Sequence, residues 1–187
     1  MIGALIGVYV ITERQYLFTM SPAELSRDLY PTNPFLEAEP IAQYIAAHTE
    51  ASDRIGVVGS EPEILFYAKR HSATGYLYTY PLMEPQPFAP RMQDEYIREV
   101  EAVHPKYLVA SLVSTSWLVQ TTSDMRILVW VDSYAKTCYD LVGVAEVSSR
   151  LEPNLRWDEA ATAYIPRDAD VVYTFRRKSD APCTAAH

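Results

Sequence analysis

Hydrophobic positions along the chain form short continuous runs that alternate with segments of helical spacing. Ile55–Val58 and Tyr107–Leu112 are short apolar runs, typical of strands that are buried on both faces of a parallel sheet. Apolar residues recur every three or four positions in 33–48 and again in 94–103, which predicts two amphipathic helices. This alternation predicts a three-layer α/β/α domain, Rossmann-like, with a mostly parallel sheet.

Capping and turn residues place the boundaries of further elements. Ser21-Pro22-Ala23-Glu24 combines a capping serine, a proline at the first helical position and the glutamate of a capping box. Gly59-Ser60-Glu61-Pro62 turns from the strand directly into a helix over Glu63–Arg70. A second short strand is expected at Gly75–Tyr78. Pro81–Pro90 has four prolines and no periodicity, so an ordered surface loop or arm is expected there.

The second half of the chain contains one ambiguous segment and a closing pair of strands. Within Met125–Lys136, the run Ile127–Val131 has the composition of a strand. The wider spacing is helical, however, and Ser123 or Asp124 precedes it as a cap, so a helix is predicted. Leu141–Val147 and Asp170–Arg176 are then expected to form an antiparallel pair at a sheet edge.

The N-terminal run Met1–Ile11 is apolar throughout. It is shorter than the roughly 20 residues that span a bilayer, and it has neither the basic start nor the cleavage site of a signal peptide. The end of a transmembrane helix, an edge strand and a core helix all fit the pattern. Residues 12–16 add charge and an aromatic ring, as at a membrane interface. Residues 1–15 are therefore expected to be the end of a transmembrane helix or an apolar stub, 16–178 a soluble α/β domain and 179–187 a flexible tail.

Composition restricts the partners and the redox chemistry. The chain has 187 residues and a formal net charge of −8, which argues against nucleic acid as a partner. Its two cysteines, Cys138 and Cys183, match no metal-binding or dithiol spacing. Two free thiols are the expectation, with a disulfide as the alternative in an oxidising compartment.

The turn Gly59-Ser60-Glu61-Pro62 is the first candidate for chemistry, because ligands of open α/β sheets lie beyond the carboxyl ends of strands. Pro62 removes one backbone N–H, and Glu61 places a carboxylate where a phosphate would bind. We expect Glu61 to satisfy the helix start instead. Asp168-Ala169-Asp170 is expected to be a turn rather than a metal site. No metal, cofactor or catalytic residue is therefore predicted.

A second candidate is an arm between Tyr76 and Phe88 that is rich in tyrosine and proline. These side chains either cover the sheet or form an interaction surface for a sugar, a lipid-linked substrate or a membrane partner. The candidate ligand or acceptor residues from both places are Ser60, Glu61, Glu63, Tyr78, Tyr80, Met83 and Phe88.

The string GSEPEILFYAKRHSATGYLYTYPLMEPQPFAPRMQDEYIREVEAVHPKYLV resembles the C-terminal soluble part of bacterial polytopic GT-C glycosyltransferases. These are of the dolichyl-phosphate-mannose protein mannosyltransferase type and use polyprenyl-phosphate sugars. Asn33-Pro34-Phe35, Ser116-Trp117, Tyr139–Val147 and Phe175-Arg176-Arg177 extend the resemblance over Tyr16–Lys178. No catalytic signature lies in the matching residues.

The resemblance implies a non-catalytic extracytoplasmic domain that follows the last transmembrane helix of such an enzyme. Its partners would be the membrane-embedded part of the same enzyme and a glycan or protein acceptor, with no nucleic acid. Its location would be the cell membrane, on the periplasmic side, and the chain by itself would not transfer sugar.

Two other functions compete with this interpretation. One is a stand-alone α/β module that binds a nucleotide or phosphorylated ligand at the same turn. The other is a small enzyme that uses Ser114 or Ser116, although neither serine lies in a G-x-S-x-G motif.

Overall fold

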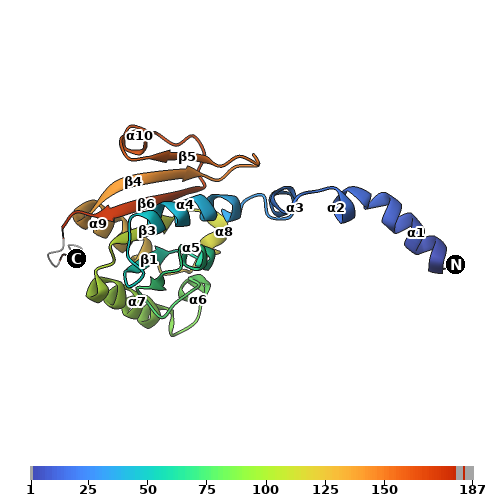
Figure 1. Ribbon diagram of the computed structural model, residues 1–187. Helices are drawn as coiled ribbons and strands as arrows, with labels where there is room; N and C mark the ends of the chain where they lie inside the picture. Colours follow the sequence, from blue (N-terminus) through green and yellow to red (C-terminus); the bar gives the residue numbers. More distant parts are fainter. Residues whose placement is uncertain (1, 180–182, 184–187) are drawn as a thin grey trace.

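The computed structural model describes residues 2–179 and Cys183 and has a mixed α/β architecture. An open six-stranded sheet lies between helices on both of its faces (Figure 1). The predicted α/β class is therefore confirmed.

The strands and helices are as follows. The strands are β1 Arg54–Val58, β2 His71–Ser72, β3 Tyr107–Ser111, β4 Tyr139–Glu146, β5 Asn154–Trp157 and β6 Val171–Arg177. The helices are α1 Ile2–Thr12, α2 Arg14–Phe18, α3 Pro22–Leu29, α4 Phe35–Ala47, α5 Pro62–Ala68, α6 Tyr80–Met83, α7 Ala89–Val103, α8 Ser114–Trp117, α9 Arg126–Cys138 and α10 Glu159–Thr162.

The sheet has a parallel half and an antiparallel half, in the order β2-β1-β3-β6-β4-β5. β1 pairs in parallel with β2 and with β3, and the register places Val57 opposite Val109. β6 runs antiparallel to both β3 and β4. The predicted closing pair is confirmed as the antiparallel strands β4 and β6. The pair does not lie at the sheet edge, as predicted, because β5 pairs with the outer side of β4.

Alternate residues of β1 and β3 face two separate hydrophobic layers, as the period of a strand requires. On one face, Ile55 and Val57 of β1 pack against α4 and α5. On the other face, Val58 and Leu108 pack against α7 and α9. α4 and α5 therefore form one outer layer, and α6, α7 and α9 form the other.

Several local predictions hold. Ser21 caps α3 with a complete capping box, since Glu24 N donates to Ser21 Oγ at 3.3 Å and Ser21 N donates to Glu24 Oε2 at 2.7 Å. The ambiguous segment after Met125 is helix α9, as predicted. Its buried face includes Ile127, Trp130 and Tyr134.

The second strand lies earlier than predicted. Lys69 adopts a left-handed conformation at the end of α5, with φ of 53°, and turns the chain back so that His71 pairs with Arg54. The segment Gly75–Tyr78 is not a strand. Its polar groups bond to α7 instead, with Gly75 N donating to Glu99 Oε2 at 2.9 Å.

The expected loop over Pro81–Pro90 is partly helical. α6 includes Pro81 in its first turn, where the missing N–H has no intrahelical partner to lose, and α7 accommodates Pro90 in the same way. Leu82 and Met83 of α6 are buried in the layer that contains α7.

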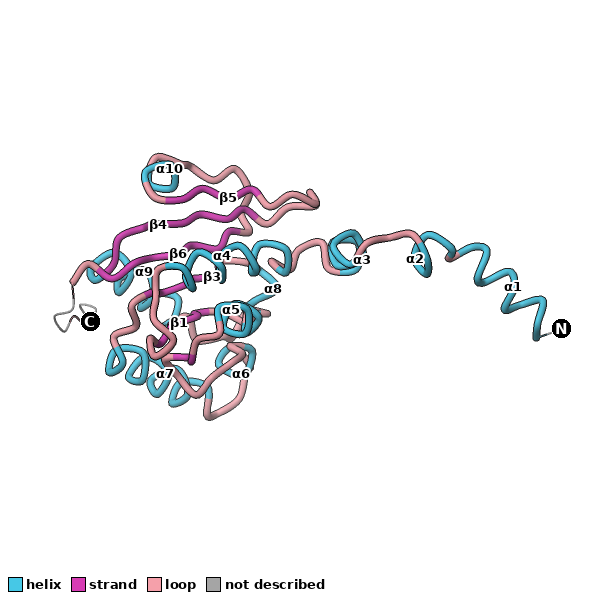
Figure 2. Tube along the Cα trace, in the orientation of Figure 1, coloured by secondary structure: helices cyan, strands magenta, loops and turns pink. Residues whose placement is uncertain are grey.

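α1 and α2 extend away from the body of the domain (Figures 1 and 2). α1 has no buried residue. Residues 2–11 of this run are helical and pack on no sheet or core, so the edge-strand and core-helix interpretations are wrong for the part that the structure describes. Within the described residues, no helix has both the length and the apolarity to cross a membrane.

Cys138 and Cys183 form a disulfide, so the expectation of two free thiols is wrong. Their separation of 45 residues hid the pairing, because β4, β5, α10 and β6 intervene before the chain returns to the end of α9. Of the tail expected at 179–187, only residue 179 and Cys183 lie within the described residues.

Replacing Cys183 by serine is expected to lower the free energy of unfolding by about 2–4 kcal/mol, because the disulfide closes a long loop in the unfolded chain. Urea unfolding of the C183S variant and of the reduced wild type should agree. Two thiols that react in the denatured, unreduced wild type would contradict the disulfide.

Candidate functional site

The carboxyl ends of β1 and β3 lie side by side and form the point at which the strand order reverses. From β1 the chain passes to β2 on one side, and from β2 it returns across β1 to β3. In open α/β sheets this position is the usual ligand site. The turn after β1 supplies Ser60 and Glu61, and the end of β3 supplies Ser111.

The Glu61 side chain is buried at this position, with 1% of its surface exposed. Its Oε1 accepts hydrogen bonds from the hydroxyls of Ser111, at 3.0 Å, and of Ser116 in α8. The two hydroxyls also lie 2.9 Å apart. The other carboxylate oxygen, Oε2, has no hydrogen-bond partner.

The electrostatics of the pocket favour the neutral form of Glu61. Burial raises the pKa of Glu61 to about 7, the hydroxyls of Ser116 and Ser111 oppose the rise, and the neighbouring Glu63 adds to it. Burial also raises the pKa of Glu63, whose Oε1 lacks a partner. None of the ion pairs between described residues includes Glu61.

A second set of hydrogen bonds joins this cluster to the aromatic arm. Thr79, directly before α6, donates its backbone N–H to Ser60 Oγ at 3.0 Å. Its hydroxyl donates to the carbonyl oxygen of Ser116 at 2.9 Å. Trp117 donates its indole N–H to the carbonyl oxygen of Ser111 at 2.7 Å. The turn after β1, the end of β3, α6 and α8 thus form one network.

Gly59 leaves the space that this network requires. Its φ is +155°, a conformation that residues with a side chain rarely adopt. A Cβ at this position would overlap Glu61 Oε2 and lie 2.7 Å from Ser111 Cβ. The absence of a side chain at Gly59 is therefore what lets the Glu61 carboxyl fold back over the strand end.

The structure brings together only some of the predicted site residues. Ser60 and Glu61 share the network, and Glu63 and Tyr80 lie near enough to interact with Glu61 electrostatically. Tyr78 and Phe88 are exposed on the arm, by 52% and 63%. Met83 is 1% exposed and belongs to the core, so it is not available for a ligand.

Glu61 does not cap α5, contrary to our expectation. It occupies the N-cap position, but its side chain makes no capping hydrogen bond. The carboxyl turns instead to the serines of β3 and α8, whose proximity only the tertiary structure creates. The anion position beyond β1 is thus filled by the chain's own carboxyl group.

Ser116, a candidate nucleophile from the sequence, belongs to this network. The residue is 2% exposed, and its hydroxyl donates to Glu61. Knowledge that β1 and β3 are neighbours would have linked Ser116 to Glu61.

Asp170, from the segment Asp168-Ala169-Asp170, accepts a hydrogen bond from Ser114 N at 2.7 Å just before β6. Within residues 2–179 and Cys183, no group of three or more acidic, histidine or cysteine side chains could hold a metal.

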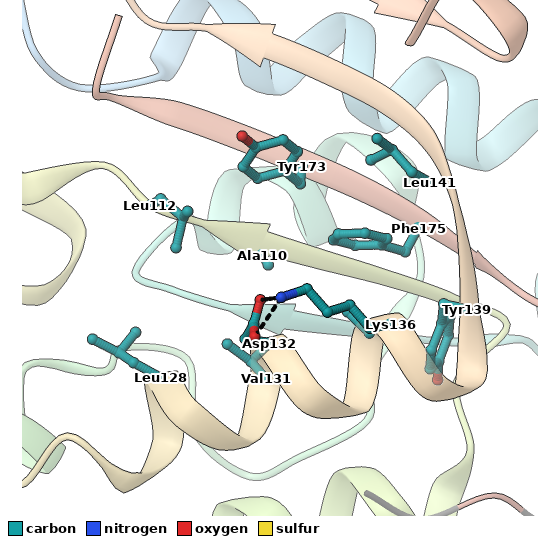
Figure 3. Close-up of a pocket in the computed structure, with 11 residues that line it drawn as sticks. Ala110, Leu112, Leu128, Val131, Asp132, Lys136, Tyr139, Leu141, Tyr173 and Phe175 are labelled. Carbon is teal, nitrogen blue, oxygen red and sulfur yellow. Dashed lines mark hydrogen bonds and ion pairs between the residues drawn. The ribbon is translucent and has the colours of Figure 1, made fainter. Parts of the chain in front are cut away.

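An apolar groove that the sequence analysis missed lies between α9 and the antiparallel half of the sheet (Figure 3). Its volume is about 480 Å³. Leu141, Tyr173 and Phe175 line it from the sheet and Leu128 and Val131 from α9. Asp132 and Lys136 form an ion pair of 2.7 Å at the groove. Such a groove depends on strand order, which sequence periodicity does not give.

Comparisons with known protein families, with curated proteins and with solved structures find no match to this chain.

Gly59→Ala is expected to destabilise the protein by about 1–3 kcal/mol, because the added methyl group overlaps the Glu61 carboxyl and the Ser111 side chain. Chemical unfolding measures the loss. The double variant with Glu61→Ala should recover part of it. If Gly59→Ala lowers the free energy of unfolding equally in the wild type and in the Glu61→Ala variant, overlap with the Glu61 carboxyl is not the cause.

Proposed function

We propose that this chain is a non-catalytic extracytoplasmic domain of a membrane glycosyltransferase that uses a polyprenyl-phosphate sugar donor. Its role is to cap the membrane part of the enzyme or to help bind the acceptor. The sequence resemblance over Tyr16–Lys178 supplies the class of enzyme. The membrane contact and the compartment have their own support in the structure.

The observation that carries the proposal is the exposed apolar helix α1. Leu5, Ile6 and Val8 are 65%, 58% and 63% exposed, and none of the helix is buried against the domain. A contiguous apolar surface of this kind indicates a membrane or protein interaction site. Because α1 extends away from the body, that partner need not touch the rest of the domain (Figure 1).

The disulfide supports the extracytoplasmic side. Disulfides persist in oxidising compartments such as the bacterial periplasm and are rare in the cytosol. Cys138 and Cys183 are both engaged in one.

The exposed arm residues support a role in contact with the acceptor or with the membrane part. Tyr78 and Phe88 are half or more exposed, while Leu82 and Met83 beside them anchor α6 in the core. Aromatic side chains with one apolar and one wet side suit such interfaces. Removal of the exposed rings should therefore affect binding more than folding.

The alternative of a stand-alone module for a nucleotide or phosphorylated ligand has less support. The carboxyl group of Glu61 occupies the strand end, and α5 begins with a proline that lacks an N–H donor. Inorganic phosphate or a nucleotide that raises the melting temperature at millimolar concentration would favour this alternative.

Membrane contact is tested by flotation of the full chain with neutral phosphatidylcholine vesicles, chosen because the chain carries a net charge of −8. Ile6→Asp is expected to weaken binding about tenfold or more, since it places a charge where the exposed Ile6 side chain would enter the apolar part of the bilayer. Val129→Asp, at an exposed position on α9, is the control and should bind as the wild type does. Equal binding by both variants would contradict a role for α1.

Sugar transfer is tested in membranes of cells that express the native gene, with a radiolabelled polyprenyl-phosphate sugar. Tyr78→Ala with Phe88→Ala is expected to reduce transfer severalfold with a change in stability of about 0.5 kcal/mol or less, because both rings are exposed. Phe66→Ala, at a position 77% exposed on α5, is the matched control. Unchanged transfer in the double variant would mean that the arm only covers the sheet.

A further inference from the structure

We propose that Glu61 is a proton-operated latch. When its carboxyl is neutral, the residues from Thr79 through α6 and the residues of α8 are held closed over the carboxyl ends of β1 and β3. When the carboxyl is ionised, these two segments open together. This inference does not depend on the proposed function, since the isolated chain contains every group involved.

The connectivity of the polar network makes Glu61 its central residue. The carboxyl receives one hydrogen bond from β3, through Ser111, and one from α8, through Ser116. Thr79 joins α6 to the same place, because it bonds to Ser60 on one side and to the Ser116 carbonyl on the other. A change at one buried carboxyl group therefore acts on both covering segments.

The surroundings of Glu61 disfavour a negative charge. Its Oε2 has no donor, although the side chain is 1% exposed. The titratable groups that interact with it are Glu63 of α5, Tyr80 of α6 and Tyr96 of α7. Burial raises the pKa of both tyrosines, so they stay neutral near pH 7, and Glu63 can only add negative charge. An unpaired buried charge is costly, and opening to water relieves it.

α8 depends on contacts at the ends of the strands for its conformation. It is a single turn of four residues, and Leu118 at its end has a φ of 49°. A left-handed conformation is unfavourable for a residue with a side chain and persists only where surrounding contacts hold it. Ser116 and Trp117 supply such contacts, since both bond to groups at the ends of β1 and β3.

The sign of the pH dependence follows from the raised pKa. The closed state binds the proton more tightly than the open state, in which Glu61 returns toward its ordinary value of 4.5. Closure is therefore fully stabilised below about pH 4.5 and loses stability as the pH rises through about 7. Between pH 6 and pH 8, the opening equilibrium is expected to rise about tenfold.

The test is hydrogen–deuterium exchange of the full chain at pH 6 and pH 8, corrected for the intrinsic dependence of exchange on pH. Protection of residues 79–83 and 112–118 is expected to fall about tenfold, while β4 and β6 keep theirs. Glu61→Gln should remove the difference. Glu37→Gln is the matched control and should keep the difference. Burial raises the pKa of Glu37 as well, but this residue pairs with Arg27 and lies outside the network.

Two further variants keep the proposal testable if Glu61→Gln does not fold. Ser116→Ala removes a donor to the carboxylate and should move the midpoint of opening to higher pH. Glu63→Gln removes a neighbouring charge and should move it to lower pH. Two results would overturn the latch. One is a loss of protection in β4 and β6 equal to that in residues 79–83 and 112–118. The other is a pH midpoint of opening that neither variant moves.

Discussion

The parallel pairing of β1 with β3 is the interaction on which the rest of the structure depends. It places Ile55 and Val57 on one face of the sheet and Val58 and Leu108 on the other, so both hydrophobic layers are built from the same two strands. It also brings Glu61, which follows β1, into contact with Ser111 at the end of β3. The cores and the polar network thus share one structural cause, and a change in this pairing would disturb all three.

The polar network lies at the carboxyl ends of β1 and β3, where open α/β sheets usually bind a ligand. A buried carboxyl with an unpartnered oxygen destabilises the closed state when it is charged and is tolerated when it is neutral. The surrounding hydroxyls reduce this penalty without removing it, because burial outweighs them in the pKa of Glu61. The site is therefore better suited to respond to protonation of Glu61 than to bind a ligand.

Two features near the ends of the described chain bear on where the domain is located. At one end, α1 presents apolar side chains that no part of the domain covers. At the other, Cys183 is linked to the end of α9 by a disulfide. An apolar contact and an oxidising compartment are both compatible with a domain that lies at the outer surface of a membrane, and the resemblance to membrane glycosyltransferases suggests which kind of enzyme that would be.

The sequence by itself determined the α/β class, the capping box of Ser21, helix α9 and the closing pair of strands, because local periodicity and capping chemistry specify such features. It misplaced β2 and included the buried Met83 among the candidate ligand residues, since a two-residue strand and a short proline-containing helix have almost no periodic signal. Only the tertiary structure decided that Glu61 bonds to Ser111 and Ser116, residues 50 and 55 positions away. Strand order and chain reversal create such contacts, and neither can be read from the spacing of residues along the chain.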